Sequence, residues 1–237
     1  MQGDRVLGMF RFGPREYIDQ FAQGLLYMNT LQYFAERETD SLRKDSHEGT
    51  SYLRKGDGGN LQIKMTPEVA KACNMPADGE FKPIANLRGP IRFQPEALQS
   101  VNVFCMYAMR ESASDKFVDA GILGFGDAFA LLTDFDEFMK RAKVAVPGTG
   151  QELRYDLVKY IDETSYEGPV GVFKKLSAFS YQSEFRIGLF PGTGAPLRLR
   201  VADLSDIVIL GRLSELNDRL RVQVNTQGRR ELQIRVS

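Results

Sequence analysis

The pattern that most restricts the fold of this chain lies in residues 181–189 (YQSEFRIGL). From Glu184 onward, polar or small residues alternate with large apolar ones, which is the period of a β-strand with one buried face. A Gln-x-Glu pair, Gln182 and Glu184, stands at the start of this strand. The alternation predicts two opposite faces, one with Glu184, Arg186 and Gly188, the other with Phe185, Ile187 and Leu189.

Many other short runs are rich in β-branched and aromatic residues, whereas helical patterns are few and brief. One helix is expected to start at Pro14 and end at Gly24, and another at Asp134, where Glu137 completes a capping box. Residues 31–36 predict a short helical turn, and residues 170–176 a short helix or turn. Strands are expected at 5–12, 25–30, 61–65, 100–109, within 122–132, and at 197–201 and 207–210, with a hairpin in 219–236 that turns at 225–228. Residues 152–162 are ambiguous, and the alternation of Leu153, Tyr155 and Leu157 favours a strand there. This pattern indicates an α+β fold with a mainly antiparallel mixed sheet and short helices, not a doubly wound α/β fold.

A length of 237 residues, of which 43% are hydrophobic, is enough for one domain with a sizeable core. We expect a single domain over residues 1–237 with two irregular parts. Residues 37–60 are polar and glycine-rich, which predicts an exposed loop insertion. Residues 66–95 contain five prolines and few periodic runs, which predicts irregular connecting structure.

The charges balance, with 31 Lys and Arg against 31 Asp and Glu. A neutral total argues against electrostatic binding of duplex nucleic acid by the whole surface, although a local patch is compatible with it. Residues 196–237 hold eight Arg against five acidic residues, a difference of 8 − 5 = +3 that is compatible with single-stranded nucleic acid. Without a signal peptide or an 18-residue apolar run, and with two distant cysteines (Cys73 and Cys105), we expect a cytoplasmic protein with reduced thiols and no membrane contact.

The single histidine, His47, excludes sites that require two histidines. The sequence also lacks the GxxxxGK[ST] pattern of a phosphate-binding loop. The glycines at 121, 124 and 126 lead into an expected strand, whereas a dinucleotide fingerprint requires a following helix.

Three groups of polar residues are candidates for a site. The first group lies on the first two expected strands and combines an arginine, which can bind phosphate, with a tyrosine and small polar residues: Arg11, Tyr27, Asn29 and Thr30. Taken singly, Arg11 is more simply a surface strand residue and Tyr27 a core aromatic.

The second group lies in the polar loop and includes Arg43, Asp45, His47 and Glu48. This loop fits either a solvated connection or an element that covers a cleft and contacts substrate through Arg43, His47 or Glu48. The third group is the pair Gln182 and Glu184. Its alternative interpretation is an ordinary exposed strand face on which Arg186 pairs with Glu184.

Together, the first and third groups resemble the three-part pattern of ADP-ribosyltransferases of the arginine-serine-glutamate type, and the resemblance implies that fold. Arg11 matches the arginine that holds the phosphates or ribose of NAD, and Asn29 and Thr30 fall on the Ser-Thr-Ser strand. Glu184 falls on the catalytic glutamate, with Gln182 two residues before it. Tyr27 is similar to the tyrosine of the histidine-tyrosine-glutamate branch.

The chain also resembles a loosely defined bacterial group of uncharacterised proteins, several of them tied to phage defence. The shared segments are a Gly-x-Leu-Tyr-x-Asn strand, a Glu-Phe-Arg-Ile strand and an Arg-x-Asp-x-x-Glu-Gly loop, here Arg43, Asp45, Glu48 and Gly49.

These resemblances imply an NAD-dependent ADP-ribosyltransferase that acts as a bacterial or phage conflict toxin. NAD would be its substrate, and no metal is expected. The acceptor would be a protein or single-stranded nucleic acid, and an antitoxin could neutralise it. Two alternatives remain open: a non-catalytic binding or sensor module of a defence system, and a metal-dependent nuclease or hydrolase that uses Asp45, Glu48 and Glu184.

Overall fold

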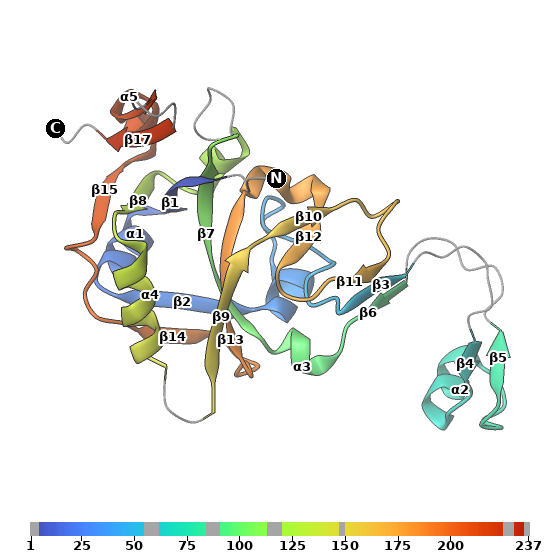
Figure 1. The fold of residues 1–237 in the computed structure, drawn as a ribbon. Helices are drawn as coiled ribbons and strands as arrows, with labels where there is room; N and C mark the ends of the chain where they lie inside the picture. The colour runs from blue at the N-terminus through green and yellow to red at the C-terminus, as the bar shows by residue number, and fades with distance from the viewer. Residues whose placement is uncertain are drawn as a thin grey trace.

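The computed structural model describes residues 5–54, 62–83, 91–112, 120–146, 150–224 and 230–234. Within these ranges the chain forms an α+β fold with mainly antiparallel sheets and short helices, as predicted (Figure 1). The helices are α1 (Arg15–Ala22), α2 (Pro67–Cys73), α3 (Glu96–Gln99), α4 (Phe135–Val144) and α5 (Leu216–Arg219). Shorter turns are the π-helix η1 (Tyr33–Arg37) and the 3-10 helices η2 (Ala120–Phe125), η3 (Ser177–Gln182) and η4 (Leu213–Glu215).

The main sheet has eight strands: β1 (Val6–Gly13), β2 (Leu25–Thr30), β7 (Asn102–Arg110), β8 (Ala128–Leu132), β9 (Glu152–Leu157), β13 (Glu184–Phe190), β14 (Leu197–Arg200) and β15 (Val208–Arg212). Smaller sheets are formed by β3 (Tyr52–Arg54), β6 (Ile91–Phe93) and β11 (Gly168–Pro169), by β4 (Gln62–Lys64) and β5 (Phe81–Pro83), by β10 (Lys159–Ile161) and β12 (Lys174–Leu176), and by β16 (Leu220–Val224) and β17 (Arg230–Ile234).

The main sheet is split beside its central strand, β7. One edge of β7 pairs with β13 along residues 102–107. Its other edge is shared, because β1 pairs with residues 107–110 and β2 pairs with residues 102–103. Residues 104–106 therefore face an opening between β1 and β2, which can receive a side chain instead of a strand.

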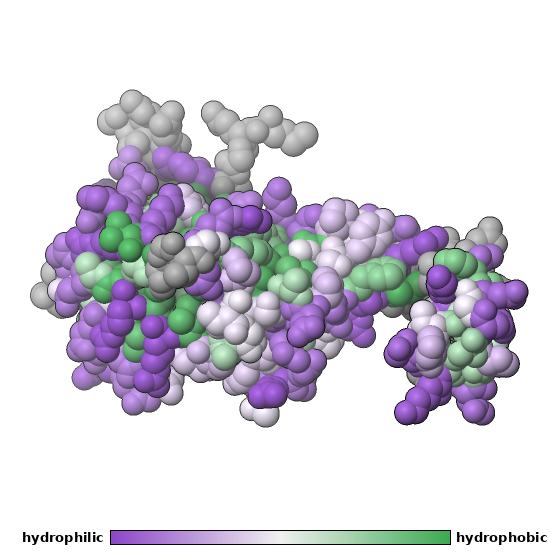
Figure 2. All heavy atoms as spheres, turned by 90° about the horizontal axis from the view of Figure 1, so that it is seen from below, coloured by the Kyte–Doolittle hydropathy of each residue, from purple (hydrophilic) through white to green (hydrophobic). Residues whose placement is uncertain are grey.

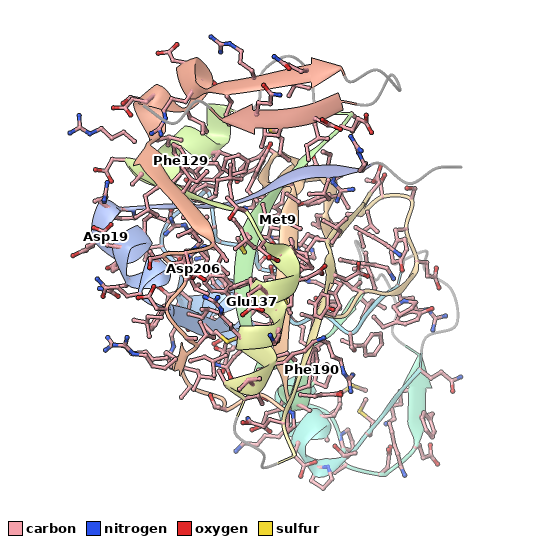
Figure 3. The ribbon with its side chains drawn as sticks, turned by 60° about the vertical axis from the view of Figure 1, so that its left-hand side comes forward. Met9, Asp19, Phe129, Glu137, Phe190 and Asp206 are labelled. Atoms are coloured by element: carbon pink, nitrogen blue, oxygen red, sulfur yellow. The ribbon has the colours of Figure 1, made fainter. Side chains whose placement is uncertain are left out.

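Both faces of the main sheet are covered. On one face Phe185 and Ile187 pack with Phe21 of α1 and Phe138 of α4 in the largest core, and Figure 3 shows α4 lying along that face. On the other face Phe10 and Phe129 pack with Leu220 at the start of the C-terminal hairpin. The alternation predicted for β13 is confirmed, since Phe185, Ile187 and Leu189 all enter the first core.

Local signals fixed several helix ends as predicted. The Asp134 carboxylate accepts a hydrogen bond from the Glu137 amide (2.9 Å) and caps α4. Gly24 follows α1 with φ +82°, and a Cβ there would lie 2.6 Å from the carbonyl oxygens of Val201 and Ala202. Only glycine fits this turn without strain.

Three segments differ from the sequence prediction. Residues 66–95 were expected to be irregular, but their described parts contain α2, β5 and β6. Thr66 caps α2 by accepting a hydrogen bond from the Val69 amide, and Pro67 occupies its first turn. Residues 170–176, expected to be a short helix or turn, contain β12, which pairs in parallel with β10. The hairpin predicted near the C-terminus is present as β16 and β17, while its turn at 225–228 lies outside the described residues.

The polar segment 37–60 also differs from the prediction of an exposed loop. Of its part up to residue 54, Asp45, Glu48 and Thr50 are buried, and β3 joins a sheet with β6 and β11. Residues 55–60 lie outside the described residues. The carboxylates of Glu38, Asp45 and Glu48 therefore belong to the interior, whereas Arg37 and Lys44 are exposed.

The small unit formed by β4, α2 and β5 stands apart from the main body in Figures 1 and 2. Its surface combines charged residues with exposed apolar ones, among them Met75 and Phe81. In the part of the chain that the structure describes, none of the helices has the length and apolar character needed to cross a membrane.

Candidate functional site

The strand β13 presents Glu184 and Arg186 to the face of the sheet opposite α4. Glu184 pairs with Tyr107 of β7 and Arg186 pairs with Cys105, so these four side chains share that face. The segment around Glu48 and strand β12 cover it, and together they enclose a cluster of charged side chains.

Four charged groups form a buried network on this face. The Arg186 guanidinium donates to both Glu48 carboxylate oxygens (2.7 and 3.0 Å) and to Glu184 Oε2 (2.7 Å). Lys175 Nζ lies 3.3 Å from Glu48 Oε1 and 3.4 Å from Glu184 Oε1. The side chains of Glu48, Lys175 and Arg186 are at most 3% exposed and that of Glu184 is 12% exposed. Two carboxylates thus balance two cations away from water, an arrangement that requires close pairing of all four.

Neutral groups complete the network. Lys175 Nζ donates to Gln182 Oε1 (2.7 Å), and Arg186 donates to the Val172 carbonyl (2.7 Å). The Glu184 amide donates to the Tyr160 hydroxyl (2.9 Å), which places that phenol at the strand entry. Tyr160 thus holds the backbone of Glu184, while Arg186 and Lys175 hold its side chain.

The network sets the charge state of its members. Burial alone would raise the pKa of Glu184, but Arg186 and Lys175 outweigh it and hold that pKa below its ordinary value. Burial likewise opposes the charged form of Lys175, yet the two carboxylates raise its pKa. Glu184 is therefore a carboxylate at neutral pH.

Arg11 occupies the opening in the sheet. It leaves β1 on the face of Met9 and Ala130, opposite to Glu184, and its Nη1 donates to the Cys105 carbonyl (2.9 Å) at the unpaired edge of β7. The guanidinium carbon lies 4.9 Å from the centroid of the Phe104 ring. Among the described residues no carboxylate forms an ion pair with it.

The surroundings make Arg11 an electrostatically unusual cation. Burial lowers its pKa, nearby Arg43 lowers it further, and Cys105 and Glu184 oppose this shift. Burial, followed by the charge of Glu184, raises the pKa of the Cys105 thiol to about 11. Arg43, Cys105 and Glu184 are thus all within electrostatic range of Arg11, although the four residues come from four separate segments.

The other residues of the first candidate group have mixed positions. Tyr27 and Asn29 share the face of Glu184, since Asn29 pairs with Val103 of β7. Tyr27 is 48% exposed, whereas Asn29 is buried and accepts a hydrogen bond from the Thr30 amide. Thr30 lies on the opposite face, where its hydroxyl accepts a hydrogen bond from the Tyr33 amide (3.2 Å) and caps the turn that follows. Thr30 therefore has a structural role that strand position alone does not reveal.

The residues of the polar loop also have separate roles. Arg43 lies over the Phe125 ring at 4.9 Å and donates to the Phe125 carbonyl (3.2 Å). His47 Nε2 lies 2.8 Å from a carboxylate oxygen of Glu163. Glu48, expected to contact substrate from an exposed loop, is instead buried against Arg186.

Asp45 lines a small cavity next to the network. The cavity has a volume of about 10 Å³, which is room for roughly one water molecule, and it is also lined by Thr50 and Lys175. Burial, and then the charge of Glu48, raise the pKa of Asp45.

Within the described ranges no three His, Cys, Asp or Glu side chains are arranged to hold a metal ion. The oxygens of Glu48 and Glu184 are paired with the cations Arg186 and Lys175. This arrangement favours ion pairing over the nuclease interpretation of Asp45, Glu48 and Glu184.

The structure brings Gln182, Glu48 and Glu184 together around Lys175. Arg11 leaves the sheet on the opposite face and is linked to Glu184 and Arg43 through electrostatic range alone, and Thr30 is separate. Sequence reasoning missed three members of the cluster: Lys175, Tyr160 and Cys105. Lys175 falls in a segment predicted as a helix or turn, so its burial on a strand was hidden. No protein-family model, no curated protein and no solved structure matches this chain.

Proposed function

We propose that this protein is an NAD-dependent ADP-ribosyltransferase that modifies a macromolecular acceptor. The observation that carries the proposal is the Arg11 guanidinium, which lies at the opening of the sheet without an ion-paired carboxylate among the described residues, in range of the ionised Glu184. The Arg11 side chain is half-buried. Withdrawing an unpaired cation from water costs free energy unless an anion joins it, and the planar guanidinium fork suits the diphosphate of NAD.

Glu184 supplies the second requirement. Breaking the bond between nicotinamide and ribose builds positive charge on the ribose, and a fixed carboxylate stabilises that charge in the transition state. The bonding pair leaves with the nicotinamide nitrogen, and a nucleophilic atom of the acceptor forms a new bond to the ribose carbon and loses its proton. Because Arg186 and Lys175 hold Glu184 ionised and fixed, its charge is in place before the reaction begins.

The remaining roles follow from position. Gln182, two residues before Glu184, would orient the acceptor, and the half-exposed Tyr27 and buried Asn29 would contact the nucleotide on the same face. Arg43 would add positive charge for phosphate. A toxin of bacterial or phage conflict, acting in the cytoplasm on protein or single-stranded nucleic acid and neutralised by an antitoxin, is the setting that we propose for this activity.

The first test is substitution of the carboxylate. Glu184→Gln should lower NAD turnover about 10²–10³-fold, because the lost interaction acts mainly in the transition state, while NAD affinity changes much less. Turnover would be followed with labelled NAD and affinity by calorimetry. Asp156→Asn, on the neighbouring strand β9 with an exposed side chain, is the matched control and should leave both values unchanged.

A second candidate function is a non-catalytic binding module of a defence system. It is favoured because both candidate catalytic side chains already have hydrogen-bond partners within the protein. The two Glu184 oxygens accept from Arg186 and Lys175, and Gln182 donates to the Leu42 carbonyl (2.6 Å). Equal turnover by the wild type and Glu184→Gln, or no NAD binding by either, would support this second function and contradict the first.

A further inference from the structure

The edge of the main sheet at β14 carries one tyrosine and two arginines, called the edge surface here. Tyr27 of β2 stands directly opposite Arg198 of β14, and Arg200 follows two residues later on the same strand. Opposite residues of an antiparallel pair point to the same side of the sheet, and so do residues two apart on a strand. All three side chains therefore lie together, on the side of the sheet that carries Glu184.

The edge surface is open to solvent. Tyr27 is 48% exposed, and Arg198 and Arg200 are exposed as well. On the other side of the same two strands, Leu26 and Leu199 are buried in the largest core. Strand β14 pairs with β2 alone and ends the sheet, beside β2 in Figure 1. The core therefore accounts for one side of this strand pair and leaves the other side for a partner.

The two arginines keep their charge available. Among the described residues, neither Arg198 nor Arg200 forms an ion pair. The nearest acidic residues after them in the sequence are already engaged, because Asp203 accepts a hydrogen bond from the backbone amide two residues later (2.8 Å) and Asp206 pairs with Arg141 (2.6 Å). Two positive charges whose Cα atoms lie about 6.6 Å apart along a strand thus face solvent.

This combination of groups favours single-stranded nucleic acid as the partner. Arginine forks bind phosphates, which recur along the strand, and an exposed aromatic ring stacks on an unpaired base. In a duplex the bases are stacked on their neighbours, so the ring would have no base to contact. An acidic peptide would pair with the arginines but would leave the tyrosine without a role.

Neighbouring groups connect the edge surface with the Glu184 site. Tyr33, in the turn that follows β2, is within electrostatic range of both Tyr27 and Arg43, because burial and then nearby acidic groups, Tyr27 among them, raise its pKa and Arg43 lowers it. The carbonyl of the residue before Arg43 accepts a hydrogen bond from Gln182 (2.6 Å), which is two residues from Glu184. A strand that leaves the edge surface over Tyr33 and Arg43 therefore reaches Gln182.

We propose that the edge surface binds single-stranded nucleic acid, with phosphates on Arg198 and Arg200 and a base stacked on Tyr27, and that this strand is the acceptor of ADP-ribose. The binding stands on the geometry, whereas the acceptor role rests on the proposed function. In the transfer, a nucleophilic atom of an unpaired base bonds to the ribose carbon and loses its proton, while nicotinamide leaves with the bonding pair. An aromatic ring has two faces, so Tyr27 can contact both the nucleotide of NAD and a base.

Binding is measured by fluorescence anisotropy with a labelled single strand of about 16 nucleotides, as DNA and as RNA, at several salt concentrations. Arg198→Gln/Arg200→Gln should lower the slope of log K against log salt by about 1.4, since each phosphate contact on a single strand contributes about 0.7. Arg212→Gln/Arg221→Gln removes two other exposed arginines without an ion pair among the described residues, and it should keep the slope of the wild type.

The tyrosine is tested with the same probes. Tyr27→Ala should weaken binding about 5- to 150-fold without changing the salt slope, and Tyr27→Phe, which keeps the ring, should bind like the wild type. The binding proposal fails if the wild type does not bind the single strand, if the two double arginine variants lose the same slope, or if Tyr27→Ala binds normally. Equally tight binding of the matched duplex or of polyglutamate would also overturn it.

The acceptor role is tested by transfer of label from NAD to the same oligonucleotide. At limiting oligonucleotide, Arg198→Gln/Arg200→Gln should lower transfer by the factor measured for affinity, and it should lower NAD hydrolysis without oligonucleotide much less. Hydrolysis of NAD and binding of the strand without transfer would refute the acceptor role. Strand binding with no NAD turnover by any variant would remove the proposed function and support the edge surface as a nucleic-acid site, whereas NAD turnover without strand binding would do the reverse.

Discussion

Replacement of Arg186 by methionine tests whether the buried network holds the fold together. Arg186 is 2% exposed and makes three hydrogen bonds to two carboxylates and one to the Val172 carbonyl. Without it, Glu48 and Glu184 would share Lys175 alone, so the network would change from neutral to a net charge of −1. Removing one partner of a buried ion pair typically costs 3–5 kcal/mol, so we expect Arg186→Met to lower the free energy of unfolding by about 4 kcal/mol.

A second substitution should recover part of this loss. In Glu48→Gln/Arg186→Met, Glu184 and Lys175 remain as one anion and one cation, so the network is neutral again. The double variant should therefore be more stable than the sum of the two single changes predicts, by roughly 0.5–3 kcal/mol. Glu48→Gln alone leaves a net charge of +1 and should also destabilise the protein.

The assay is equilibrium unfolding in urea at pH 7, followed by two spectroscopic probes to check that the transition is cooperative. Arg15→Met is the surface control, because Arg15 and its partner Asp19 are 52% and 41% exposed. An exposed pair of this kind contributes at most about 1 kcal/mol. If Arg186→Met costs no more than Arg15→Met, or if the Glu48 and Arg186 effects are simply additive, the network does not carry the coupling argued here.

Two further predictions concern stability. The folded protein holds the pKa of Glu184 below its ordinary value. The stability that the ionised Glu184 contributes is therefore complete above about pH 4.3 and is lost as the pH falls from there through the folded pKa. Unfolding midpoints between pH 7 and 3 should fall more steeply in the wild type than in Glu184→Gln, and equal slopes would contradict the assigned shift. Asp134→Ala should lower the free energy of unfolding by about 1 kcal/mol by removing the cap of α4, whereas Asp136→Ala, next to it in the first turn, should have a smaller effect.

The sequence predicted well those features that depend on local pattern. The strand at Glu184, its two faces, the cap at Asp134 and the glycine turn at Gly24 all follow from residue spacing and backbone preference. For the segment 66–95 the prediction of irregular structure was wrong, because it rested on the five prolines of the segment. The Thr66–Pro67 start of α2 was present in the sequence, and Asn74 ends that helix in the left-handed conformation.

The network could not be predicted in the same way. Glu48 and Arg186 are 138 positions apart in the sequence, and nothing local distinguishes a carboxylate that will be buried from one on a solvated loop. Their shared strand face predicted Arg186 as a partner of Glu184. It did not predict that both side chains would be buried. The opening beside β7, which receives Arg11, depends on two strands sharing one edge, a property of topology that no single segment contains.

The network and Arg11 bear differently on function. The balance of Glu48, Glu184, Lys175 and Arg186 is a sufficient structural reason for those four residues, so it does not by itself distinguish an enzyme from a binding module. Arg11 has a hydrogen bond to the Cys105 carbonyl and a contact with the Phe104 ring, but among the described residues no carboxylate forms an ion pair with it. A glutamine at its position could donate to the Cys105 carbonyl without burying a charge, and Arg43 makes that charge more costly to hold. A cation kept at this opening despite its cost is best explained by an anionic ligand, and that is why the proposed NAD site is centred on Arg11 as well as Glu184.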